Sequence, residues 1–173
     1  MEITKIITGP LEENCYLLEK NKECLLIDPG EDYDKIVKYI QNKKVLAILV
    51  THHHFDHTAS IPNLVKNFHY PVYDSNNLKR GDNQLGSFHF EVIETFGHTL
   101  DSLTFYFPKE QKMFTGDFLF YDTIGRTDFE DSNEEEMRKS IEKIKNYPNE
   151  IEIYPGHARM TTLGREKEFN IFF

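Results

Sequence analysis

The stretch VLAILVTHHHFDH, residues 45–57, joins an apolar run directly to four of the chain's eight histidines. The run over 44–50 is too short for a helix and is typical of a strand that is covered on both faces. Histidines repel one another when they are protonated, so a cluster of them beside a core needs a compensating partner. These residue types point to a metal ion.

The composition is that of a globular chain. Its 173 residues suit one domain that spans residues 1–173, and 39% of them are hydrophobic. No apolar stretch approaches the roughly 18 residues that a membrane span needs. The first ten residues, MEITKIITGP, lack a basic segment followed by a long apolar core. We therefore expect a cytoplasmic protein without a membrane partner.

The charge and the cysteine count disfavour other classes of protein. A net charge of −9 disfavours nucleic acid as a partner, because affinity for a phosphate backbone depends on clustered Lys and Arg. Two cysteines, Cys15 and Cys24, are too few for a disulfide framework and lie in apolar, strand-like surroundings. We expect them to be reduced thiols in the core.

Short strands alternate with helices along the chain, without repeats or low-complexity linkers. The expected strands occupy about 2–8, 14–19, 23–28, 44–50, 70–74, 88–95, 102–107, 111–115 and 150–154. The expected helices occupy about 33–41, 57–68, 133–145 and part of 163–170. Ser132 is the expected N-cap of the third helix, and the polar segment 75–87 is expected to be a loop. The pattern predicts a mixed α/β chain built in layers.

Side chains that bind metals also follow three other expected strands. His98, Asp117 and His157 each stand just after one of them. Strand ends that deliver ligands into loops assemble a site at one rim of a sheet. The sequence therefore predicts a single shared site.

The number of ligands suits two ions better than one. A catalytic zinc ion takes about four ligands from imidazole, carboxylate and water. The assignments are His52, His54 and His98 to a first ion, Asp56, His57 and His157 to a second, and Asp117 to a bridge between them. We expect two divalent ions, zinc before the others, although iron and manganese accept the same ligands. His53 is not assigned as a ligand, and we expect it to pack against the protein or to support the ligands.

Seven motifs occur at intervals over nearly the whole chain. They are GPLEENCYLLE (9–19), LLIDPGE (25–31), THHHFDH (51–57), GHTLDS (97–102), FTGDFLF (114–120), IGRTDF (124–129) and YPGHARMTTLGREKEFN (154–170). Together they resemble the metallo-β-lactamase superfamily and, within it, the glyoxalase II-like (hydroxyacylglutathione hydrolase-like) hydrolases. The resemblance implies a four-layer αββα sandwich whose site lies along one edge, with the same ligand sets. It also makes Arg126 a candidate contact for a substrate carboxylate, and pairing with Asp128 or Asp122 is an equal alternative.

The expected reaction is hydrolysis of a thioester such as S-lactoylglutathione by a hydroxide that bridges the two ions. Asp117 would hold the two ions together, and Asp56 would orient the hydroxide and accept its proton. A thiolate leaves without protonation and no motif supplies a dedicated acid, which favours thioesters or other activated esters over amides. True β-lactamases generally have a cysteine near the position of Asp117, and this chain has none there.

Two departures from the family pattern concern the substrate and the surroundings of the site. The sequence shows no counterpart of the helical C-terminal domain that helps two-domain glyoxalase II enzymes to hold glutathione, so the substrate stays open. Asp101 adds a carboxylate near His98, and we expect it to lie in solvent.

A mononuclear iron persulfide dioxygenase is the main alternative, because that branch shares GRTDF and two of the histidine motifs. It usually has Ala where Phe55 stands and PAH where this chain has PGH, so Phe55 and Gly156 favour the hydrolase. A nuclease is disfavoured by the negative charge. A non-enzymatic metal-binding module would not need a ligand set that leaves room for a bridging water.

Overall fold

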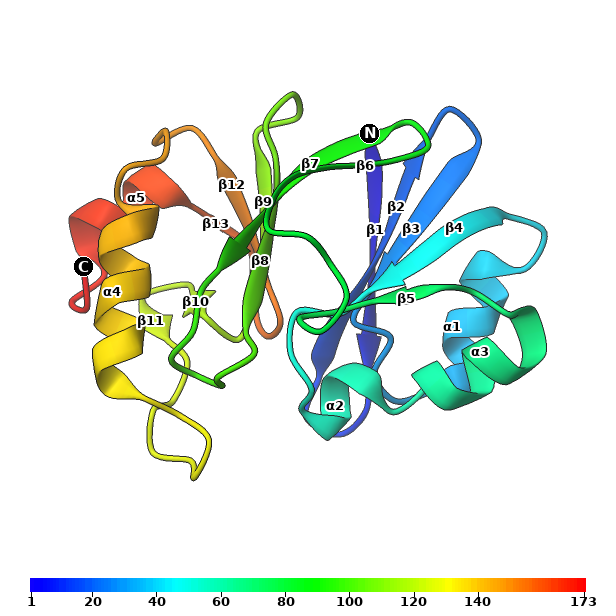
Figure 1. Ribbon diagram of the computed structural model, residues 1–173, viewed down its shortest axis with the longest axis horizontal. Helices are drawn as coiled ribbons and strands as arrows, with labels where there is room; N and C mark the ends of the chain where they lie inside the picture. Colours follow the sequence, from blue (N-terminus) through cyan, green and yellow to red (C-terminus); the bar gives the residue numbers. More distant parts are fainter.

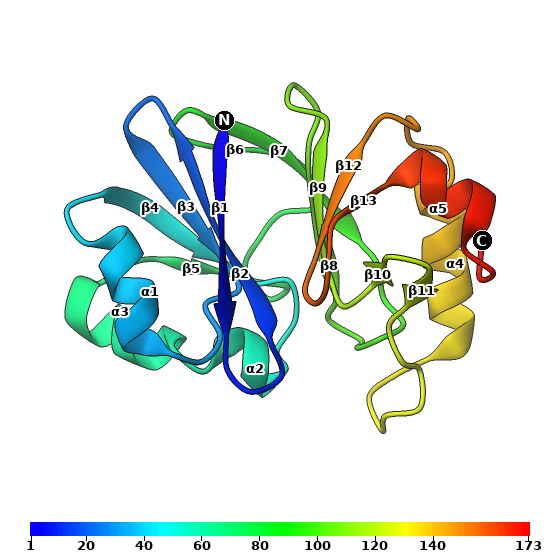
Figure 2. The same ribbon diagram turned by 180° about the vertical axis from the view of Figure 1, so that it is seen from behind.

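Two β-sheets face each other at the centre of the molecule, and helices cover their outer faces (Figure 1). The computed structural model describes residues 1–173. Helices α1 (Tyr33–Ile40) and α3 (Ile61–Phe68) lie against the first sheet, and α4 (Glu134–Ile144) and α5 (Leu163–Phe169) lie against the second (Figure 2). This arrangement is the four-layer αββα sandwich that the sequence implied.

The first sheet has five strands in the order β1-β2-β3-β4-β5. Their bounds are β1 Glu2–Thr8, β2 Glu13–Lys20, β3 Glu23–Ile27, β4 Lys44–Leu49 and β5 Val72–Tyr73. The first three are antiparallel to one another, whereas β3, β4 and β5 run parallel. The carboxyl ends of β3 and β4 therefore lie at the same edge.

The second sheet has six strands in the order β13-β12-β9-β8-β7-β6. Their bounds are β6 Gly81–Leu85, β7 Phe88–Glu94, β8 Leu103–Phe107, β9 Lys112–Gly116, β12 Glu152–Pro155 and β13 Thr161–Thr162. Strands β9 and β12 are parallel, so the loops after them also meet at one edge. A separate two-stranded ribbon joins β10 (Leu119–Phe120) to β11 (Thr123–Ile124).

Apolar side chains fill the space between the sheets and the space beneath each helical layer. In β4, Ala47 and Leu49 belong to the central cluster, while Ile48 and the following Val50 belong to the cluster under the helices. Burial on both faces explains why this strand reads as a continuous apolar run. The expectation for 44–50 is confirmed.

The two cysteines lie in the outer cluster of the first sheet. Cys15 and Cys24 are both buried there and neither forms a disulfide. They pack as small apolar residues, as the sequence predicted.

The helix expected over 57–68 is wrong in its extent, because two helices occupy this region. The short helix α2 (Phe55–Thr58) ends before a break, and α3 begins at Ile61 with Pro62 in its first turn. Proline lacks an N–H and its ring collides with the carbonyl of the preceding turn, so the chain cannot pass through Pro62 as one helix. The break lets Ser60 donate its backbone N–H to the Gly30 carbonyl at 2.8 Å.

The loop expected over 75–87 contains the edge strand β6, which pairs with β7 through a turn at Gly86. The strand is polar because an edge strand can leave its side chains in water, and the absence of an apolar alternation hides it in the sequence. The N-cap expected at Ser132 is also displaced by one residue. Asn133 Oδ1 accepts from the backbone N–H of Glu136 at 3.0 Å.

The three strands β10, β11 and β13 have two residues each and were not predicted from the sequence. No helix of the structure has the length and apolar character that crossing a membrane requires.

Candidate metal centre

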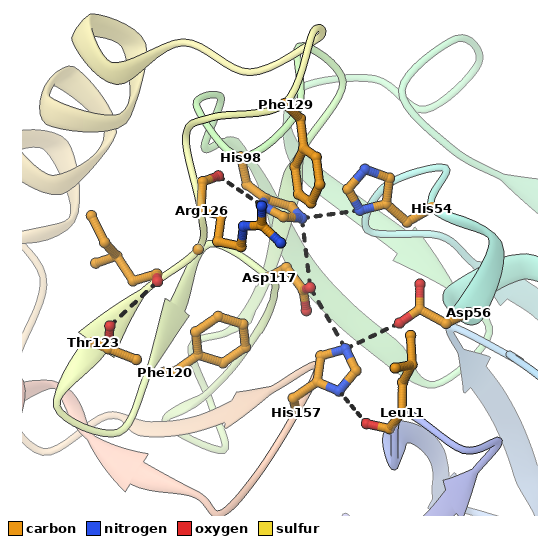
Figure 3. Close-up of a pocket in the computed structure, with 12 residues that line it drawn as sticks. Leu11, His54, Asp56, His98, Asp117, Phe120, Thr123, Arg126, Phe129 and His157 are labelled. Atoms are coloured by element: carbon orange, nitrogen blue, oxygen red, sulfur yellow. Dashed lines mark hydrogen bonds and ion pairs between the residues drawn. The ribbon is translucent and has the colours of Figure 1, made fainter.

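The seven residues that the sequence assigns to metal binding come together at one edge of the sandwich. Four loops supply them, all of which follow strands. The residues are His52, His54, Asp56 and His57 after β4, His98 after β7, Asp117 after β9 and His157 after β12. Figure 3 shows five of their side chains around one pocket.

The ligand atoms form two groups, and Asp117 lies between them. Within a group all ligand atoms lie within 4.8 Å of one another. One group is His52, His54, His98 and Asp117, and the other is Asp56, His57 and His157. A third set of mutually close atoms, from Asp28, His52 and His57, lies behind them. Asp117 Oδ1 lies 3.3 Å from His57 Nε2, and its Oδ2 lies 3.5 Å from His98 Nε2. One carboxylate thus faces an imidazole of each group.

Backbone carbonyls orient two of the imidazoles. Nδ1 of His98 lies 2.9 Å from the carbonyl oxygen of Arg126, and Nδ1 of His157 lies 3.0 Å from that of Leu11. A carbonyl oxygen can only accept, so each Nδ1 donates its proton outward. Nε2 is then the nitrogen of each ring that is available to a metal ion.

The buried carboxylate of Asp28 orients two further imidazoles. His57 Nδ1 donates to Asp28 Oδ2 across 3.1 Å. Thr51 donates its hydroxyl proton to the same oxygen at 2.6 Å, so its Oγ1 accepts from His52 Nδ1 at 3.1 Å. Both rings therefore also present Nε2 to the cluster. Hydrogen bonds of this kind, from a ligand histidine to an outer carboxylate, fix ring orientation in metal sites.

Unpaired buried atoms indicate that the cluster fits a cation. His52 Nε2, His57 Nε2 and Asp117 Oδ1 are buried without a hydrogen-bond partner. Nδ1 of His54 and Nε2 of His98 face each other at 3.0 Å. Buried polar atoms without partners are costly, and a divalent ion among these atoms would satisfy them. The imidazole and carboxylate set suits zinc, iron or manganese.

The protonation states of the cluster side chains also indicate that the cluster fits a cation. Burial, together with the neighbouring imidazoles, holds the pKa of His52 well below its usual value, so the ring is neutral. Burial alone would lower the pKa of His57, but Asp117 and Asp28 raise it well above the usual value. Burial alone would raise the pKa of Asp117, but the contact with His57 outweighs burial and lowers this pKa below its usual value. A bound cation would replace the extra proton on His57.

Sequence reasoning missed the supporting roles of Asp28 and Thr51. The available signal was that Asp28 ends the apolar segment CLLID, and Thr51 ends the neighbouring apolar run. It also missed Glu13, a fully buried acid whose Oε1 lies 3.8 Å from His57 Nδ1. Burial raises the pKa of Glu13 to about 9, so this side chain is neutral at pH 7.

Arg126 lines the pocket, but its guanidinium is paired. Nε and Nη2 donate to the two carboxylate oxygens of Asp128 at 2.8 and 2.9 Å. The guanidinium also lies over the ring of Phe129, 4.5 Å from its centroid. Of the two pairings considered from the sequence, the one with Asp128 is present, whereas Asp122 pairs with Arg165.

The expectation that Asp101 lies in solvent is wrong. Its Oδ2 accepts from His53 Nδ1, and its Oδ1 accepts from the Thr99 hydroxyl at 2.6 Å. His53 Nε2 contacts Asp74 at 3.1 Å, so the ring lies between two carboxylates. Partial burial opposes a charge on His53, but the two carboxylates raise its pKa overall. His53 thus connects the loop after β5, which carries Asp74, to the loop before β8, which carries Asp101.

The pocket over the cluster has a volume of about 540 Å³. Five of its twelve lining residues belong to the cluster. The others are Leu11, Phe120, Thr123, Ile124, Gly125, Arg126 and Phe129. A cavity of this size accommodates a small molecule.

Comparison with known proteins agrees with this geometry. The family model of the metallo-beta-lactamase superfamily matches residues 8–80 and 74–157. A "Probable metallo-hydrolase" from Streptococcus pyogenes serotype M6 is 34% identical, over 100% of this chain and 90% of that protein. The hydroxyacylglutathione hydrolase GloC of Haemophilus influenzae is 31% identical, over 99% of this chain and 98% of that protein.

Solved structures have the same fold over almost the whole chain. The BLEG-1 B3 metallo-beta-lactamase superposes with a TM-score of 0.93 at 30% identity, covering 99% of both chains. The di-iron-bound form of TTHA1623 gives 0.91 at 30% identity, covering 98% of this chain and 100% of that one. ETHE1 from Myxococcus xanthus gives 0.88 at 27% identity, covering 99% and 84%.

The family match covers most of the residues, and it includes every side chain of the cluster. Relatives that align over nearly their full length are named as hydrolases. The chain therefore belongs to the metallo-beta-lactamase superfamily and is a metal-dependent hydrolase.

Proposed function

We propose that the protein hydrolyses thioesters or related activated esters with two divalent metal ions, and that S-lactoylglutathione is the first substrate to test. The observation that carries this proposal is the pair of ligand groups joined by Asp117, with unpaired atoms facing inward from both. Two adjacent ions, when bound, supply Lewis acidity and make hydroxide available near pH 7.

The chain's own residues have distinct roles in this proposal. The first group holds one ion through His52, His54 and His98, and the second holds another through His57 and His157 together with Asp56. Asp117, whose two oxygens face an imidazole of each group, would contribute a ligand to both ions. Carbonyl, carboxylate and hydroxyl partners behind four of the rings direct their Nε2 atoms to the cluster, so little reorganisation accompanies binding. These rings are His52, His57, His98 and His157.

Asp56 is the residue that orients the nucleophile and accepts its proton. Its carboxylate lines the pocket, with Oδ2 3.2 Å from His157 Nε2. Burial disfavours its charge, but contacts with His157 and His57 lower its pKa below the usual value, so it is ionised at neutral pH. An ionised carboxylate at the pocket wall can accept a hydrogen bond from water.

The pocket composition supports a thioester over an amide. Outside the cluster, the only lining side chains with exchangeable protons are Thr123 and Arg126. Neither is an effective acid near pH 7. A thiolate needs no such acid because its conjugate acid has a pKa of about 8.5, whereas an amine leaving group does. The name of the full-length relative GloC supports the choice of a glutathione thioester.

The mononuclear iron persulfide dioxygenase remains the second candidate, because ETHE1 from Myxococcus xanthus is among the similar structures. Gly156 supports the hydrolase. A Cβ at this position would lie 2.3 Å from Asp117 Oδ1 and 2.6 Å from His57 Cε1. Glycine thus leaves room for the bridging carboxylate and for a ligand of the second ion.

The test is hydrolysis of S-D-lactoylglutathione by purified protein of known metal content. We expect two ions per chain and turnover of about 10 per second. Asp117→Ala should reduce turnover to about 1% or less, because the residue contacts both ligand groups. Asp82→Ala, at an exposed site on β6, is the matched control and should retain full activity.

Other outcomes would redirect the assignment. Two ions with no hydrolysis of any thioester, but with cleavage of a chromogenic cephalosporin, would make a lactam the substrate. One iron per chain, with oxygen consumption in the presence of glutathione persulfide, would establish the dioxygenase instead.

A further inference from the structure

The walls of the pocket beyond the metal cluster are mainly apolar. Four of the seven lining residues outside the cluster are Leu11, Phe120, Ile124 and Phe129. Leu11 and Phe129 lie on opposite sides of the cluster in Figure 3. A ligand bound over the cluster therefore has a large apolar side chain on each of these two sides.

Contacts with the cluster hold the backbone at Leu11 and the ring of Phe129. The Leu11 carbonyl accepts the Nδ1 proton of His157, so the loop between β1 and β2 is attached to the second ligand group. The Phe129 ring packs edge-on against His54 and His98, with centroids 5.3 and 5.6 Å away. The ring and the loop are thus positioned beside the cluster before a ligand binds, which lowers the entropic cost of binding.

Both side chains are also incompletely covered by the protein. Leu11 is 64% exposed and Phe129 is 37% exposed. Single exposed apolar residues are common, but two that face each other across a pocket offer area that a ligand can bury. Both exposed side chains line the pocket, so a ligand that fills it can cover them.

No free cation competes with this apolar recognition. Arg126 is the only charged lining residue outside the cluster, and its guanidinium is bound by both oxygens of Asp128. The guanidinium also lies over the Phe129 ring, 4.5 Å from its centroid. The charge of Arg126 is thus paired with Asp128, and its guanidinium adds to the wall beside Phe129.

The geometry points to selection of thioesters that carry an aryl or bulky alkyl group next to the carbonyl or the sulfur, held between Leu11 and Phe129. This inference rests on the proposed hydrolase function and specifies its substrate class. In the reaction water adds its oxygen to the acyl carbon as the C–S bond breaks, giving a carboxylate, a thiol and one proton. No oxidant or further reactant is needed.

Three thioesters of similar intrinsic reactivity provide the test. S-acetyl-N-acetylcysteamine is small on both sides, S-phenylacetyl-N-acetylcysteamine has an apolar acyl group, and S-benzyl thioacetate has an apolar thiol. For at least one of the two apolar substrates, we expect kcat/KM to exceed that of the small one by about tenfold or more.

Leu11→Ala and Phe129→Ala should each reduce this preference about tenfold, measured as the ratio of kcat/KM for the apolar thioester to kcat/KM for the small one. Phe129→Leu loses the ring contacts with His54 and His98 but keeps an apolar side chain, so it should retain most of the preference and separates the two effects. Phe169→Ala removes an exposed phenylalanine from α5, outside the pocket, and should change nothing. The metal content of every variant is measured beside its kinetics.

The possible failures are distinguishable. Equal kcat/KM values for the three thioesters, or a preference that survives both alanine variants, would overturn the apolar selection and leave the hydrolase in place. Failure of the metal-loaded wild type to hydrolyse any thioester would overturn the hydrolase proposal and the selection with it.

Discussion

Gly156 lies directly against the two side chains that connect the ligand groups. If a Cβ were added at this position, it would overlap Asp117 Oδ1 at 2.3 Å and His57 Cε1 at 2.6 Å. The first is a carboxylate held between imidazoles and the second belongs to a fully buried ring, so neither can move cheaply. A methyl group at this position therefore competes with the second metal site and leaves the first largely intact.

We accordingly predict that Gly156→Ala lowers the metal content from about two ions to about one per chain, with a matching loss of hydrolysis. Elemental analysis after equilibration with zinc, iron or manganese checks it. Asp82→Ala is the control, because Asp82 is exposed on β6 and lies outside the cluster and the pocket. Retention of two ions by Gly156→Ala would show that the cluster can shift to accept the methyl group.

The Arg126–Asp128 pair gives a second prediction at the scale of single residues. Both side chains are 67% exposed, and exposed ion pairs typically contribute about 1 kcal/mol or less. An anionic substrate can therefore displace Asp128 at a small cost. Asp128→Asn should lower the KM for S-lactoylglutathione about two- to fivefold, because the competing charge is removed.

Steady-state kinetics separate this effect from a general change in the loop. The KM for the uncharged S-acetyl-N-acetylcysteamine and the kcat for both substrates should stay constant in Asp128→Asn. Equal changes in KM for the charged and uncharged thioesters would contradict the role of Asp128 as a competitor for Arg126.

At the scale of elements, the strands with apolar patterns were predictable and the exceptions had local causes. The run over 44–50 has the strand pattern and is a strand, because both of its faces are buried. Pro62 divides a segment whose apolar spacing alone suits one helix. The edge strand Gly81–Leu85 is stabilised by pairing with β7. Its own polar sequence does not predict this tertiary contact.

The start of α4 offers a prediction at this scale, because two neighbouring residues competed for the N-cap. The side chain of Asn133 accepts from the backbone of Glu136, whereas the Ser132 hydroxyl donates to the Phe129 carbonyl. Asn133→Ala should destabilise the protein by about 1 kcal/mol, since it leaves a helix N–H without its cap.

Ser132→Ala is the matched comparison and should cost less, because the hydroxyl caps no helix N–H. Denaturant unfolding monitored by circular dichroism measures both variants. A larger loss of stability for Ser132→Ala than for Asn133→Ala would show that Ser132, and not Asn133, stabilises the start of the helix.

At the scale of the whole molecule, the seven candidate ligands were predictable because each follows a strand and the residue types are distinctive. The residues that support them were harder to find, because they act through contacts between distant segments. The Leu11 carbonyl reaches His157 across 146 positions of the sequence. The apolar wall at Phe129 likewise depends on a loop that folds back over His54 and His98. Contacts between segments so far apart in the sequence cannot be predicted from hydrophobic periodicity or motif spacing.

The cluster also couples metal binding to the stability of the sandwich, because the four loops that meet there come from both sheets. Without a cation, His52 Nε2 and Asp117 Oδ1 stay buried and unpaired. Free metal at a thousandfold excess over its Kd stabilises a fold by about 4 kcal/mol. For a chain of this length that corresponds to roughly 8–16 °C in Tm.

Chelation should therefore lower the Tm by about that amount, and the added metal should restore it. Differential scanning calorimetry, with metal analysis of the same samples, makes the measurement. His57→Gln, which lacks the imidazole between Asp28 and Asp117, should show a smaller response to the chelator than the wild type. An unchanged Tm after complete removal of the metal would mean that the two sheets hold the empty cluster together without help from a cation.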